Sequence, residues 1–187
     1  MSIASDKTVV TLEELLASPD SGRFEIVNGQ LEEIQVSNLS VSVGMKLSSI
    51  LTVYCQAAKS GETFGPDCYY QCFGHDRTRA RRPDISFIAR ERLPADWLAE
   101  GYFNIPPDLA VEVISTNDRA YEVSAKVSDY LAAGVKLVWV IDPQDRHLMI
   151  HRLDGTVQKL SEQETLTGEQ VLAGFSCRVA EFLPACG

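Results

Sequence analysis

The sequence predicts an α/β protein with a mixed central β-sheet, flanking helices and a β-hairpin near each end of the chain. Short apolar runs rich in β-branched residues indicate buried strands, and longer segments with apolar residues at helical spacing indicate amphipathic helices. The strand-like runs are Ile85–Ala89, Leu109–Ile114 and Lys136–Ile141, and the helix-like segments are Asn38–Lys59 and Ala120–Ala133. Because no repeat, low-complexity segment or linker interrupts this pattern, residues 1–187 are expected to form one domain.

The shorter elements follow from caps and turns. A capping-box pattern that begins at Thr11 predicts a short helix ending before Pro19. The dipeptides Asn28-Gly29 and Asp154-Gly155 each predict a hairpin, because these residues tolerate the positive φ angles of a type I′ turn. On the first hairpin Glu25 alternates with apolar neighbours, and the hairpin pattern alone favours a solvent-facing side chain. Segment 164–183 contains short pieces whose order the sequence does not specify.

Composition limits the class of protein. No apolar run approaches the roughly 20 residues that a membrane span requires, and the N-terminal residues lack the apolar core of a signal peptide, so a cytoplasmic protein is expected. Five cysteines, an odd number without a CxxC pair, favour reduced structural thiols. The net charge of −9 is atypical of a general nucleic-acid binder, which is normally basic.

The basic residues are concentrated around one carboxylate. Between His75 and Arg92 six arginines face three acids, so this window carries +3 and the rest of the chain −12. A positive rim around Asp84 would suit a phosphodiester substrate. The same arginines could instead form a solvated loop that balances nearby acids, and the sequence leaves both interpretations open.

Two apolar runs each carry one carboxylate, Asp84 at the start of its strand and Glu112 inside its own. An unpaired carboxylate in a buried strand costs several kcal/mol. If the strands are neighbours, a shared Mg²⁺ or Mn²⁺ ion would compensate both charges. Alternatively, Asp84 opens a turn and Glu112 pairs with an arginine. Lys126, one residue off the apolar face of the second helix, favours the metal site, and its removal is expected to leave that helix packed.

Pro83-Asp84 followed by Glu112 in a Val-Glu-Val-Ile-Ser string resembles the PD-(D/E)XK nuclease superfamily. The chain is more closely similar to the Uma branch, the "putative restriction endonuclease" family, along nearly its whole length. The further matching segments are Arg23–Gly29, Arg82–Phe87, Pro107–Ser115, Lys126, Tyr130, Ala133–Val135 and Val138–Pro143. No single segment is specific, but their order and spacing are.

The resemblance implies a restriction-endonuclease-like core with Asp84 and Glu112 as metal ligands. The superfamily's lysine, two residues after the glutamate, is replaced here by Ile114, and Lys126 matches the lysine that the Uma branch carries on the following helix. Glu25 matches an N-terminal glutamate that could complete the acidic site as a third metal ligand. Family members often carry a histidine near the start of the long helix, and residues 38–43 contain none.

These observations lead to the expectation of a Mg²⁺-dependent endonuclease that hydrolyses DNA. The alternatives are a catalytically inactive nuclease-fold module for binding or assembly, and a metal-dependent enzyme acting on a small phosphate ester. Because double-strand cleavage needs two active sites, a homodimer or larger homo-oligomer is expected. The loop Glu91–Pro107 would expose Trp97, Tyr102 and Phe103 as its anchors.

Overall fold

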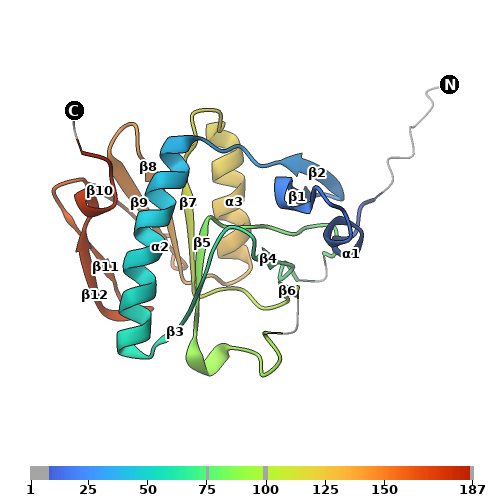
Figure 1. Ribbon diagram of the computed structural model, residues 1–187, viewed down its shortest axis with the longest axis horizontal. Coiled ribbons are helices and arrows are strands. Elements are labelled where there is room, and N and C mark those ends of the chain that lie inside the picture. The colour runs from blue at the N-terminus through green and yellow to red at the C-terminus, as the bar shows by residue number, and fades with distance from the viewer. Residues whose placement is uncertain (1–8, 75, 99–100, 186–187) are drawn as a thin grey trace.

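The computed structural model describes residues 9–74, 76–98 and 101–185, and a six-stranded sheet lies at its centre (Figure 1). The strand order is β10-β9-β8-β7-β5-β3, with β7 and β8 parallel and the other neighbours antiparallel. The strands are β3 Gly61–Phe64, β5 Ile85–Ala89, β7 Leu109–Val113, β8 Leu137–Asp142, β9 His147–Arg152 and β10 Val157–Ser161. The predicted mixed α/β architecture is therefore confirmed.

Two helices cover opposite faces of this sheet, α2 (Asn38–Ala58) and α3 (Ala120–Ala132). Side chains alternate between the faces of a strand. On β7, Leu109, Val111 and Val113 pack in the core beneath α2, whereas Ala110 packs beneath α3. The same alternation turns Glu112 toward α3.

The core beneath α2 is the larger of the two. It contains Leu47 and Leu51 of α2, Trp139 of β8 and Phe175 of the C-terminal hairpin. That hairpin consists of β11 (Thr165–Gly168) and β12 (Leu172–Arg178), which the sequence did not order. A capping box at Ser37 begins α2, and Lys59 ends it in the left-handed conformation, with φ 52°.

The N-terminal elements lie beside the sheet. They are α1 (Leu12–Leu16), the 3₁₀ turn η1 (Ser21–Arg23), β1 (Phe24–Val27) and β2 (Gln30–Glu33). Thr11 forms the predicted capping box, and Asn28 and Gly29 have φ angles of 51° and 74°, as a type I′ turn requires. A bridge between Ile26 and Ala80 attaches the hairpin to the segment that precedes β5.

The loop Glu91–Pro107 does not present its aromatic residues as exposed anchors, so that prediction is wrong. Phe103 is 6% exposed and lies 4.9 Å from Phe64 and 5.5 Å from Tyr70, ring centre to ring centre. Trp97 packs edge-on against Phe64, at 5.6 Å. The remaining short elements are β4 (Tyr69–Tyr70), parallel to β6 (Tyr102–Phe103), and the 3₁₀ turns η2 (Arg90–Arg92) and η3 (Val179–Glu181). An aromatic cluster therefore holds the loop against the protein.

Two composition-based expectations can be compared with the structure. Within the described ranges, no helix is both long enough and apolar enough to cross a membrane. Four of the cysteines, Cys55, Cys68, Cys72 and Cys177, are free thiols, and Cys186 lies outside the described residues.

Gly61 of β3 lies against β5 with no room for a side chain. A Cβ atom at this position would lie 2.1 Å from the Ile88 carbonyl oxygen, which belongs to the backbone and cannot rotate away. We expect Gly61→Ala to lower the free energy of unfolding by about 1–3 kcal/mol, the usual cost of overpacking. Gly22→Ala is the matched control, because nothing lies within 4 Å of its added Cβ. Equal urea midpoints for the two variants would disprove the clash.

Candidate active site

Strand pairing places Asp84 and Glu112 opposite each other. In the antiparallel pair β5–β7, Ile85 is the partner of Val111, so the next pair outward is Asp84 with Glu112. Directly opposite residues share one face of a sheet. Asp84 Oδ2 accepts a hydrogen bond from the Val113 amide at 2.6 Å, which fixes the side chain beside β7. Both carboxylates therefore lie on the face that α3 covers.

Helix α3 provides the donors for Glu112, whose side chain is almost fully buried. Lys126 Nζ lies 3.0 Å from Glu112 Oε2, and the Tyr130 hydroxyl donates to Glu112 Oε1 at 2.7 Å. Residues four apart on a helix share a face, so Lys126 and Tyr130 reach the same carboxylate. The sequence prediction gave Tyr130 no role at the site. Its position four residues after Lys126 on a predicted helix is the pattern that could have identified it.

Glu25 is 2% exposed, so the solvent-facing position that its hairpin pattern favours is wrong. Its Oε1 accepts the Arg82 amide at 2.7 Å, and its Oε2 lies 3.0 Å from Arg81 and 3.4 Å from Lys126 Nζ. The side chains of β1 alternate between two faces, as the sequence predicts. The face that carries Glu25 is covered, however, by the segment around Ala80, which is distant in sequence. Glu25 thus joins Asp84, Glu112 and Lys126 in one cluster.

Removal of Lys126 is therefore expected to affect the buried carboxylates, an effect that its position on the predicted helix did not indicate. Its side chain is 19% exposed, and its ammonium lies between Glu25 and Glu112, which are both buried. A neutral residue at this position would leave α3 packed but would leave two buried carboxylates without their cation.

The arginines between residues 75 and 92 do not form a positive rim around Asp84. Arg81 and Arg82 are 3% and 4% exposed and are held by carboxylates. Arg79 and Arg81 pair with Asp129, Arg82 pairs with Asp67 and Arg92 pairs with Asp108. Four of the six arginines thus balance acids, as the alternative interpretation predicts, but Arg81 and Arg82 are buried and do not belong to a solvated loop.

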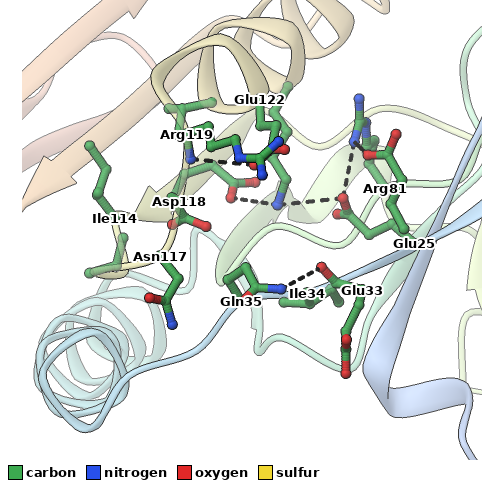
Figure 2. A pocket seen from close by; sticks show the side chains of 15 residues that line it. Glu25, Glu33, Ile34, Gln35, Arg81, Ile114, Asn117, Asp118, Arg119 and Glu122 are labelled. Carbon is green, nitrogen blue, oxygen red and sulfur yellow. Dashed lines mark hydrogen bonds and ion pairs between the residues drawn. The ribbon is translucent and has the colours of Figure 1, made fainter.

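A pocket of about 440 Å³ opens beside this cluster (Figure 2). Glu25, Arg81, Glu112 and Lys126 form part of its wall, and the turn before α3 and the end of β2 form its rim. The rim residues with charged side chains are Glu32, Glu33, Asp118, Arg119 and Glu122. Because four of these five rim residues are acidic, the pocket attracts cations and repels an anion that has no cation bound to it.

Burial shifts the titration of the two strand carboxylates. It raises the pKa of Asp84 to about 6, although the Val113 amide and Lys126 oppose the shift. It also raises the pKa of Glu112 to about 7, and the charges of Asp84 and Glu25 add to this increase against the effect of Lys126. Burial alone would lower the pKa of Lys126, but Glu112, Glu25 and Asp84 raise it overall, so its ammonium stays charged.

These shifts predict how stability depends on pH without added metal. Because the folded-state pKa values of Asp84 and Glu112 lie above the ordinary values near 4, the folded protein binds these protons more tightly than the unfolded chain. Their contribution is complete below about pH 4 and is lost as the pH rises through 6–7. We expect Glu112→Gln to flatten the fall in the free energy of unfolding between pH 5.5 and 8 by on the order of 1–3 kcal/mol, which thermal melts across this range would measure. Glu62→Gln, at an exposed position, should keep the wild-type profile.

A second acidic group lies at the turn between β8 and β9. Ligand atoms of Asp142, Asp145 and His147 all lie within 4.8 Å of one another, the one such group of three found in the described part of the chain. The Asp142 Oδ1 atom already accepts the backbone amides of Gln144 and Asp145, each at 3.0 Å. Glu112 pairs with Val140 of β8, two residues before Asp142, but the pocket that it lines contains none of the three residues of this group.

The mixed sheet, its two covering helices and the flanking hairpins define an α/β protein of the restriction-endonuclease-like class. A model of the Uma2 family, described as "Putative restriction endonuclease", matches residues 11–180. The chain therefore belongs to the Uma2 family.

Comparison with solved structures supports the fold. A crystal structure described as a putative nuclease belonging to DUF820, from Anabaena variabilis ATCC 29413, matches with a TM-score of 0.78. The two sequences are 17% identical, and the match covers 92% of this chain and 97% of that chain. At this identity the likeness establishes a shared fold alone. A search of curated proteins found no match.

Proposed function

We propose that this protein is an endonuclease that uses Mg²⁺ or Mn²⁺ to hydrolyse phosphodiester bonds in DNA. The observation that carries the proposal is the meeting of Asp84, Glu112 and Lys126 on the α3 side of the sheet, beside an open pocket. The description of the Uma2 family and of the Anabaena protein as nucleases supports the same activity.

The donor set fits a hard divalent cation, which prefers oxygen ligands. Asp84 bonds to the protein through Oδ2, and its other oxygen makes no hydrogen bond to the described residues. Glu112 lies directly opposite Asp84 and forms an ion pair with Lys126. Asp84 and Glu112 would therefore hold the ion. Glu25 is held by the Arg81 guanidinium and the Arg82 amide and lies 3.4 Å from Lys126 Nζ, so we propose that it completes the acidic site by holding Lys126.

Each residue then has a physical role in phosphodiester hydrolysis. A bound divalent cation polarises the phosphate and lowers the pKa of an attacking water. Lys126, kept charged by three carboxylates, faces the negative charge that develops on the phosphate. Tyr130 fixes the orientation of Glu112, and Glu25 fixes Lys126 from the opposite side.

A non-catalytic nuclease-fold module is the second candidate. Two observations favour it: the acidic pocket rim and the engagement of four nearby arginines in ion pairs, which leave less positive charge to attract DNA. A divalent cation would supply part of the missing positive charge, so metal dependence separates the two candidates.

The deciding experiment is nicking of supercoiled plasmid with Mg²⁺, Mn²⁺ or EDTA. The wild type should nick only with a divalent cation, and Asp84→Ala should lose this activity. Asp145→Ala is the matched control, because it removes an exposed carboxylate from the second acidic group and should remain active. Nicking by Asp84→Ala at the wild-type rate would disprove the proposed site, and DNA binding without nicking by the wild type would favour the non-catalytic module.

A further inference from the structure

The outer face of α2 carries almost no charge. Among the 21 residues of this helix, Lys46 is the single charged residue. Val41, Met45 and Val53 are 54%, 63% and 68% exposed. Figure 1 shows α2 across one side of the sheet, and none of the described elements lies over its outer side. Contiguous exposed apolar side chains of this kind mark interaction surfaces.

Five exposed residues of α2 form a stripe along the helix that is symmetric about its middle residue. Val41, Met45, Ser49, Val53 and Ala57 are exposed and follow one another at intervals of four. Rows of residues four apart form the ridges that interlock when two helices pack. Ser49 stands in the middle, with Met45 and Val53 equally far on either side. A two-fold axis at Ser49 would therefore place Met45 of each copy against Val53 of the other.

The surface beside the stripe has the same character. Ala173, Gly174 and Ser176 of β12 are exposed, and Tyr54 of α2 donates a hydrogen bond to the Ala173 carbonyl. The stripe from Val41 to Ala57 extends about 24 Å along the helix at 1.5 Å per residue. The added strand surface broadens the patch beyond a single helix ridge.

Charge identifies the occupant of this surface. The chain carries a net charge of −9, so two copies repel each other wherever their acidic surfaces meet. The α2 face, which carries no acid and only Lys46 as a charged residue, allows close approach without bringing acids together, whereas a basic partner would gain nothing from it. We propose that α2 is the interface of a homodimer, in which the helices of two copies pack antiparallel about a two-fold axis at Ser49.

Sedimentation tests the interface without reference to catalysis. The wild type at micromolar concentration should sediment at twice the 20.6 kDa mass of the chain. The variant Met45→Glu/Val53→Glu should raise the dissociation constant at least ~30-fold, because it places charges in the centre of the contact. Val157→Glu, at a residue 52% exposed on β10, is the matched control and should leave the dimer intact. A monomeric wild type, or a dimer that the double variant does not weaken, would overturn the proposal.

A cross-link tests the symmetry with a mild substitution. Ser49→Cys should form an intermolecular disulfide under oxidising conditions, because a residue on a two-fold axis meets its own copy. Val157→Cys and the wild type, with its own free thiols, measure the background. Cross-linking of Ser49→Cys at the level of Val157→Cys would show that the axis does not pass through this stripe.

Discussion

Replacing Arg81 by methionine should lower the free energy of unfolding by about 3–5 kcal/mol, the usual cost of removing one partner from a buried ion pair. Arg81 is 3% exposed and donates to Glu25 at 3.0 Å and to Asp129 at 2.7 and 2.9 Å. It thereby joins the N-terminal hairpin to α3. Without it, the buried Glu25 carboxylate keeps Lys126 as its remaining cation in the described part of the chain.

The matched control for Arg81 is Arg77→Met, an exposed arginine of the same segment that should change stability by less than about 0.5 kcal/mol. Urea unfolding of the two variants and the wild type gives the comparison. If Arg81→Met unfolds at the same midpoint as Arg77→Met, the Glu25–Arg81–Asp129 contacts do not hold the hairpin on α3.

The second large effect is expected at Lys126. Lys126→Met should lower the rate of metal-dependent nicking about a hundred-fold or more, because it removes a positive group from the place where negative charge develops. It should also lower the melting temperature at pH 8 without metal, since Glu112 and Glu25 lose their shared cation. Near pH 5.5 the second effect should diminish, because Glu112, whose pKa is about 7, is then protonated.

A conservative variant separates the chemical role of Lys126 from its structural role. Lys126→Arg retains the charge and should recover most of the stability at pH 8, while the longer, planar guanidinium should not recover the full rate. A nicking rate of Lys126→Met equal to that of the wild type would assign Lys126 to folding alone.

Much of the fold could be predicted because it depends on local patterns. The apolar runs around Glu112 and Trp139 identified β7 and β8, and the Asn28-Gly29 turn identified the first hairpin. The two carboxylates could be selected because a charge inside an apolar run is costly wherever the strand lies. Their position on one face required the pairing of β5 with β7, which no local pattern specifies.

The errors share a physical origin in contacts between distant segments. Glu25 is buried because the segment around Ala80 covers its hairpin, and Phe103 of the loop is buried because it packs against Phe64 and Tyr70. The sequence did not indicate that arginines between residues 75 and 92 form ion pairs, because their partners Asp129, Asp67 and Asp108 lie elsewhere in the chain. Composition reports which charges are present but not which of them are already paired.

Because side chains alternate between the two faces of β7, its core residues and Glu112 are subject to different evolutionary constraints. Leu109, Val111 and Val113 maintain the core beneath α2, while Glu112, on the opposite face, contributes nothing to that core. Substitutions that remove the charges of Glu112 and Lys126 together could therefore accumulate in a lineage without disturbing the core beneath α2. A one-residue insertion in β7, by contrast, would move the carboxylate into the core and the core residues toward α3. Descendants of this chain are thus freer to lose their chemistry, or to acquire another, than to change the spacing of this strand.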